Sequence, residues 1–129
     1  MKTKLFILLL ALFAVTTTVS AQTRISCSSF ETCLLDENFE EVGCVETEEP
    51  CLFTFSEAET MITHTTDVDK TTYYVTKREV DDTMITYTTT SDTGENFLFI
   101  VMVDGSEVLM FFTDGDDNFM IAFTVKAVF

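Results

Sequence analysis

Apolar and β-branched residues recur along most of this chain in short runs, with acidic, Ser-containing or Gly-containing breaks about every ten to twelve residues. Such spacing is typical of an antiparallel all-β domain. Apart from residues 30–38, which fit either a helical turn or a loop, no segment after residue 21 shows a helical period. The pattern predicts strands at 24–30, 40–46, 51–56, 59–66, 71–80, 83–91, 95–104, 107–113 and 118–128.

Two glycine-containing breaks indicate how neighbouring strands are connected. The pair Asp104-Gly105 predicts a two-residue type I′ hairpin, a turn with positive φ at both central positions. The segment Asp92-Thr93-Gly94 predicts a slightly longer hairpin with Gly94 in the left-handed conformation. The expected fold is an antiparallel meander of about eight strands, forming a small barrel or a strongly curved sheet.

The two halves of the meander differ in what lies on their faces. Around Tyr73 and Tyr74 the strands alternate, as expected where one face is in water. The last three strands are apolar on both faces and therefore need cover on both sides. One side is the interior, and the other must meet the N-terminal segment, a second copy or lipid. We expect a homodimer through these C-terminal strands, covering Leu98, Ile100, Met102 and Met120.

The first twenty-one residues have the pattern of a secretory signal peptide. Lys2 and Lys4 precede the apolar run Leu5 to Val15, and small residues follow at Val19-Ser20-Ala21. The run is shorter than the ~20 residues of a membrane-spanning helix, so no stable membrane anchor is expected. The sequence thus predicts a signal peptide at 1–21, a single β domain at 22–129, and a secreted or periplasmic protein.

The charge of the domain limits its partners. The whole chain has a net charge of −15, and removal of the two lysines of the signal leaves −17. Nucleic acids and anionic lipid surfaces would repel such a protein. The charge favours cations, including Ca²⁺, or basic partners, although like charge also serves simply to keep a protein soluble.

Four cysteines, at positions 27, 33, 44 and 51, lie in the first quarter of the domain. An even number in an exported domain predicts two disulfides. If 24–35 folds back on 40–51, Cys33 faces Cys44 and Cys27 approaches Cys51, and we favour this nested pairing among three connectivities. The spacing does not match a redox or zinc motif, and no histidine lies nearby in the sequence. The expected role is to staple the N-terminal segment to the sheet.

Candidates for catalysis or metal binding are few. The single histidine, His64, lies among threonines and is expected at the surface or rim. No catalytic constellation can be assembled around it, so neither an enzyme nor a cofactor is expected.

The acidic segment that contains Asp114, Asp116 and Asp117 resembles the opening of a Ca²⁺ loop. It lacks the glycine and the closing glutamate of an EF-hand, which favours an ordinary hairpin turn. Asp67 and Asp69 are weaker candidates for the same ion.

Five short motifs lie between Leu52 and Phe129: Phe53-Thr-Phe55, Glu59-Thr-Met-Ile-Thr-His-Thr-Thr66, Thr72-Tyr-Tyr-Val75, Ser91-Asp-Thr-Gly94 and Phe123-Thr-Val-Lys-Ala-Val-Phe129. Through these motifs the chain resembles a group of small exported bacterial proteins with no established activity, whose strand plan is similar to short lipocalin-like barrels. The resemblance implies a fold and export and transfers no site residue; the lipocalin Gly-x-Trp motif is absent.

The sequence favours a non-enzymatic exported binding module that holds a small apolar or amphipathic ligand inside the barrel. The competing interpretation is that the same side chains simply fill the interior. Further alternatives are a Ca²⁺-assisted cell-surface adhesion protein and a small outer-membrane barrel; the alternating C-terminus favours the latter, and the absence of Trp opposes it. The predicted wall is Phe55, Tyr73, Val75, Ile85, Tyr87, Phe97 and Phe99.

Overall fold

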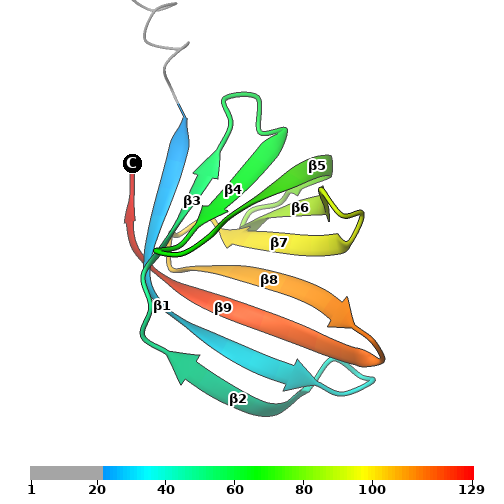
Figure 1. Ribbon diagram of the computed structural model, residues 1–129. Coiled ribbons are helices and arrows are strands. Elements are labelled where there is room, and N and C mark those ends of the chain that lie inside the picture. Colours follow the sequence, from blue (N-terminus) through cyan, green and yellow to red (C-terminus); the bar gives the residue numbers. More distant parts are fainter. Residues whose placement is uncertain (1–21) are drawn as a thin grey trace, which may run out of the picture.

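The computed structural model describes residues 22–129, so the predicted signal peptide lies outside the described residues. Within that range the chain forms strands and turns and contains no helix (Figure 1). Residues 22–129 therefore contain no helix that could cross a membrane. The nine strands are β1 (Thr23–Leu35), β2 (Glu41–Thr47), β3 (Cys51–Phe55), β4 (Met61–Thr65), β5 (Lys70–Val80), β6 (Met84–Ser91), β7 (Asn96–Met102), β8 (Glu107–Asp114) and β9 (Asp117–Val128).

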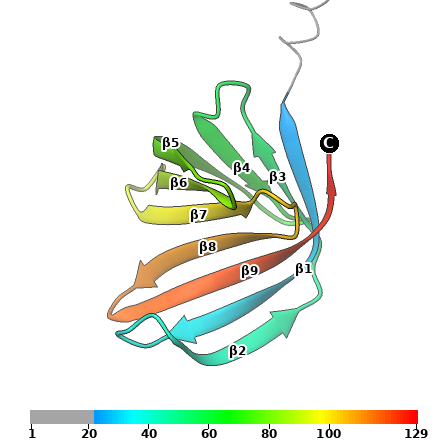
Figure 2. The ribbon, with the colours of Figure 1, turned by 180° about the vertical axis from the view of Figure 1, so that it is seen from behind.

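All strand pairs are antiparallel, and eight strands close into a barrel in the order β1-β3-β4-β5-β6-β7-β8-β9. Closure depends on β1, which pairs with β9 over residues 25–35 and with β3 over residues 23–27. The second half of β1 pairs with β2, the one strand outside the barrel. Seen from behind, β8, β9, β1 and β2 follow one another along one side (Figure 2). The predicted all-β barrel with a disulfide in its N-terminal region is confirmed.

Aromatic side chains form the core, since alternate residues of each strand point inward. In β3, Cys51, Phe53 and Phe55 are buried, while the residues between them are partly exposed. The Phe53 ring lies 4.8 Å from that of Phe123 and 6.0 Å from that of Phe99, measured between centroids. These rings join β3, β7 and β9 across the barrel, so packing and strand pairing hold the same closed shape.

Strand β1 extends further than predicted, and the expectation of a helical turn or loop at residues 30–38 is wrong up to Leu35. A β-bulge interrupts its pairing with β9 between Cys27 and Ser29. The extra residue shifts the alternation by one position. Cys27 faces the interior, while the next inward residue is Phe30, which contacts Phe123 at 5.6 Å. Because a strict alternation of inward and outward residues breaks at such a shift, the sequence pattern predicted the strand only to residue 30, whereas it continues to Leu35.

The hairpin glycines are placed as predicted, although one turn type differs. Gly94 has φ of 86° and donates its backbone N–H to the carbonyl of Ser91, confirming the longer hairpin. The predicted type I′ turn at Asp104-Gly105 is wrong, because only Gly105 has positive φ. Its N–H donates to the carbonyl of Met102, and residues 103–106 separate β7 from β8, so the connection has four residues rather than two.

The outward face differs around the barrel. On β5 it carries the exposed Tyr74 and the Lys77–Glu79 ion pair, which form a polar surface. On β7–β9 it carries partly exposed apolar rows. Strand β2 contacts β1 and does not fold over these rows, so no strand of residues 22–129 covers them. The rows are Leu98, Phe111 and Met120, and Ile100, Leu109 and Ala122.

Candidate functional site

The seven predicted wall residues all lie in or against the core, but they do not enclose one central cavity. Tyr73 packs edge-on against Phe97 and Phe99, with 4.9 Å between ring centroids in both pairs. Val75 packs against the same core. The middle of the barrel is therefore filled by rings, as in the competing interpretation of the sequence. The remaining three wall residues, Phe55, Ile85 and Tyr87, reach an opening at one end of the barrel.

This opening, which we call the Glu59 mouth, is a cavity of about 250 Å³. It lies at the end of the barrel where the β3–β4 and β7–β8 turns meet the beginning of β1 and the end of β9. Its wall is mainly aliphatic and aromatic, and two carboxylates, Glu59 and Glu107, belong to its lining. The apolar side chains of its lining include Ile25, Phe55, Ile85, Val101 and Val125.

Glu59 carries the polar chemistry of this mouth. One carboxylate oxygen accepts a 2.6 Å hydrogen bond from the Tyr87 hydroxyl. The other lies 3.1 Å from Nε of Arg78, whose guanidinium is 5.9 Å from the centre of the Tyr87 ring. Burial, with the hydrogen bond to Glu59, raises the pKa of Tyr87 to about 12, so the phenol stays protonated at neutral pH.

The backbone at Glu59 is in an unusual conformation, with φ of 55°. A non-glycine residue in this region costs about 1 kcal/mol or more. The position is fixed by its N–H, which donates to the carbonyl of Ser56, and by the contacts with Tyr87 and Arg78. Strain of this kind is retained where the surroundings require it, often at ligand sites.

A second opening lies at the opposite end, beside the β6–β7 and β8–β9 turns. It is larger, about 470 Å³, but it is wider open to solvent and contains more polar surface. Phe97, Phe112 and Phe119 follow one another along its wall, with ring centroids 5.6 Å and 5.4 Å apart. Because the rings pack on each other and the rim is broad, this opening offers less enclosure for a ligand than the Glu59 mouth.

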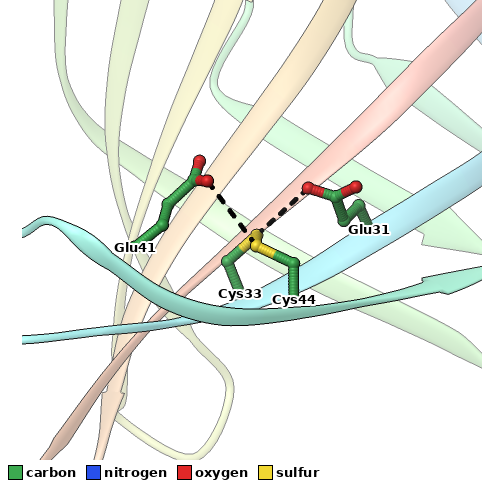
Figure 3. The surroundings of a disulfide bond; sticks show 4 residues. All are labelled: Glu31, Cys33, Glu41 and Cys44. Carbon is green, nitrogen blue, oxygen red and sulfur yellow. Dashed lines mark hydrogen bonds between the residues drawn. A yellow bond between two sulfur atoms is a disulfide. The ribbon is translucent and has the colours of Figure 1, made fainter.

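The Cys33–Cys44 disulfide is formed, as predicted, between register partners of β1 and β2 (Figure 3). Glu31 Oε1 lies 3.3 Å from Cys33 Sγ, and Glu41 Oε2 lies 3.6 Å from Cys44 Sγ. Among residues 22–129, these four form the one group with three or more potential metal ligands within 4.8 Å of one another. Both sulfurs are bonded to each other, so neither is a thiolate ligand. The disulfide indicates an oxidising, extracytoplasmic setting.

The other two cysteines are register partners of β1 and β3, and their thiols are both buried and unbonded. The expectation that no histidine lies near the cysteines holds only along the sequence. The β3–β4 hairpin brings His64 close to Cys51, whose pKa is raised by the hydrogen bond with Cys27 and by burial, and His64 offsets part of that rise. His64 is partly exposed, as a rim position would be, but its ring stacks on Phe53 with 4.6 Å between centroids and meets that of Phe123 at 5.5 Å, and its Nε2 is buried.

The predicted Ca²⁺ ligands lie at an exposed turn. Asp114 and Asp117 are the paired ends of β8 and β9, with Asp116 between them. Their carboxylates are not gathered within 4.8 Å of one another, and neither are those of Asp67 and Asp69 with a third ligand. The metal site stays a prediction without support from the geometry.

Sequence reasoning missed Glu59 and Arg78. Their contacts with Tyr87 join the β3–β4 turn to β5 and β6, and the Glu59–Tyr87 bond spans 28 positions. Neither Glu59 nor Arg78 belongs to the alternation of apolar residues that identifies inward positions, and a positive φ at a glutamate has no sequence signature. Comparisons of the chain with protein-family models, curated proteins and solved structures give no significant match.

Proposed function

We propose that this protein is a non-enzymatic binding module that takes a small amphipathic ligand into the Glu59 mouth. The observation that carries the proposal is an aliphatic and aromatic cavity whose lining includes Glu59 and Tyr87, two polar groups fixed by their hydrogen bond and by the ion pair of Glu59 with Arg78. Binding sites of small molecules commonly combine an apolar wall with a few fixed polar groups.

The size of the cavity favours a compact ligand. At about 250 Å³ it is slightly below the usual range for drug-sized molecules, so a single ring system or a short aliphatic chain fits better than a long lipid. The apolar body would lie against Ile25, Phe55 and Val125, with the polar end directed to Glu59. The filled aromatic centre stops the ligand from passing deeper into the barrel.

Charge favours a neutral or cationic polar end. Glu59 is already paired with Arg78, whereas Glu107 has no ion-pair partner among residues 22–129. An anionic ligand would meet both this carboxylate and the net charge of the domain.

Binding fits this arrangement better than catalysis. Among the described residues, Cys51 and His64 are a thiol and an imidazole in proximity, but both lie against the aromatic core away from the mouth. A substrate would have to displace Phe53 or Phe123 to reach them. The eight-stranded barrel agrees with a lipocalin-like strand plan, since lipocalins are eight-stranded up-and-down barrels. We also propose that the protein belongs to the group of small exported bacterial proteins that its sequence resembles.

The neutral fluorescent probe N-phenyl-1-naphthylamine tests the proposal. We expect saturable binding to the exported protein, with fluorescence enhancement. Val101→Trp, which fills the mouth, should weaken binding at least tenfold. Val68→Trp is the matched control, because Val68 is 93% exposed and outside the mouth, and it should bind like the wild type.

The wild-type protein showing no saturable binding, or equal binding by both tryptophan variants, would contradict a site at this mouth. Circular dichroism of both variants checks that the fold is retained. Native mass spectrometry of protein recovered from its host supplies an independent readout, in which a co-purified small molecule should be absent from Val101→Trp.

A further inference from the structure

Cys27 and Cys51 face each other across the seam where β1 meets β3. They are direct register partners, and each lies two residues from a buried neighbour on the same face, Ile25 on β1 and Phe53 on β3. Cys27 is 1% exposed and Cys51 is 7% exposed. Because register partners in an antiparallel pair project to the same side, both sulfurs point into the barrel.

The two sulfurs already interact. A hydrogen bond from the Cys51 thiol lowers the pKa of Cys27, and the same hydrogen bond raises the pKa of Cys51 well above its usual range. His64 lies beside Cys51, while its buried Nε2 has no hydrogen-bond partner among the described residues. The ligand atoms of these three residues do not all lie within 4.8 Å of one another, which disfavours a metal site.

We propose that Cys27 and Cys51 form a second disulfide in the exported protein, closing the β1–β3 seam from inside the barrel. The first disulfide gives the precedent in this chain: Cys33 and Cys44 are also antiparallel register partners, and they are bonded at a Cα–Cα distance of 4.1 Å. Directly opposed positions bring Cβ atoms to the separation that a disulfide needs.

The oxidant is a disulfide of the exporting compartment, carried by a small molecule or an oxidoreductase. The Cys27 thiolate attacks it, forming a mixed disulfide and releasing one thiol. Cys51 then attacks the Cys27 sulfur, its proton leaves with the second released thiol, and the net reaction converts two protein thiols and one disulfide into one protein disulfide and two thiols. Since both sulfurs are buried in the closed barrel, the reaction precedes closure.

Burial predicts different behaviour for the two bonds. Cys44 is exposed, so a reductant reaches the β1–β2 disulfide in the folded protein. The proposed bond between Cys27 and Cys51 is enclosed and should resist the same reductant until the barrel opens.

The test uses the exported full-length protein, purified without reductant, unfolded and treated with iodoacetamide. We expect no alkylation and an intact mass four hydrogens below that of the reduced chain. After native treatment with dithiothreitol, labels should appear on Cys33 and Cys44 alone, and on Cys27 and Cys51 only when denaturant is added. Two labels on Cys27 and Cys51 without any reductant would overturn the proposal.

Paired variants assign the bonds. Cys33→Ser with Cys44→Ser should keep one disulfide that resists native reduction, whereas Cys27→Ser with Cys51→Ser should keep one that is readily reduced. If either variant fails to fold, peptide mapping of the wild-type protein after proteolysis under non-reducing conditions decides the pairing. A Cys27–Cys51 peptide supports the proposal, and any other pairing overturns it.

Discussion

Replacing Phe53 by alanine tests whether the centre of this barrel is a packed core. The Phe53 side chain is fully buried and touches three rings: His64 at 4.6 Å, Phe123 at 4.8 Å and Phe99 at 6.0 Å between centroids. The substitution removes the ring from a space whose walls are hydrogen-bonded strands. Such walls cannot move inward freely, so much of the volume would remain as a cavity.

The expected cost is about 4–5 kcal/mol of unfolding free energy. Phe→Ala substitutions in cores cost about 3–5 kcal/mol, and aromatic pairs contribute about 0.5–1.5 kcal/mol each beyond the buried area. Three such contacts place Phe53 in the upper part of that range. Domains of this size are stable by about 5–15 kcal/mol, so the variant would retain the fold only marginally.

Urea denaturation followed by circular dichroism measures the loss. Phe129→Ala is the matched control, since the Phe129 ring is 63% exposed, and we expect a change below about 0.5 kcal/mol. A loss under about 2 kcal/mol for Phe53→Ala, with an unchanged slope, would refute the packed centre. Comparable losses in both variants would show that exposure does not govern the effect.

Four further outcomes are expected. The folded pKa of Tyr87, raised to about 12 from 10, means that the folded state holds its proton more tightly, so wild-type stability should fall between pH 10 and 12. In urea titrations the free energy of unfolding of Tyr87→Phe should fall by up to about 2 kcal/mol less than that of the wild type between pH 10 and 12. If the two proteins lost stability in parallel with pH, the raised pKa of Tyr87 would be contradicted. Glu31→Gln should speed reduction of the neighbouring disulfide by an anionic thiol severalfold at low salt, because a carboxylate 3.3 Å from Cys33 Sγ repels the attacking thiolate; unchanged rates would exclude this repulsion. Millimolar Ca²⁺ against EDTA should leave the thermal midpoint unchanged, since Asp114, Asp116 and Asp117 do not converge; a rise of several degrees would restore the Ca²⁺ site. Light scattering at ~0.15 M and 1 M NaCl should show a dimer through the outer face of β7–β9, tighter at high salt; a monomer in both would rule it out.

Most strands could be predicted from the sequence, because their side chains alternate and acidic or glycine-containing turns separate them. The structure begins and ends β3 to β9 within two residues of the predicted bounds. Strand β1 was the exception. The bulge at Cys27–Ser29 reverses which residues face inward, so Phe30 and Cys27 lie on one face despite their odd separation.

The chemistry at the Glu59 mouth was less accessible to prediction. Phe55, Ile85 and Tyr87 could be selected because apolar residues on one face of a strand are expected to point inward. Glu59 and Arg78 depend on how the barrel closes, since neither belongs to an apolar pattern and their contacts cross from a turn to two strands. The proximity of His64 to Cys51 likewise depends on the register of the β3–β4 hairpin.

Strand β2 contributes little to the core, which gives the Cys33–Cys44 disulfide its structural role. All its residues except Thr47 are exposed, so hydrophobic burial does not hold this strand in place. Its attachment depends on backbone pairing with β1 and on the Cys33–Cys44 bond, which closes a short loop and contributes about 3 kcal/mol. Glu41 and Glu46 lie on this strand, and charged side chains on an edge oppose pairing with another chain. The outermost strand is thus fastened by a covalent bond and kept from further pairing by charge, while β1 is free to close the barrel on its other side.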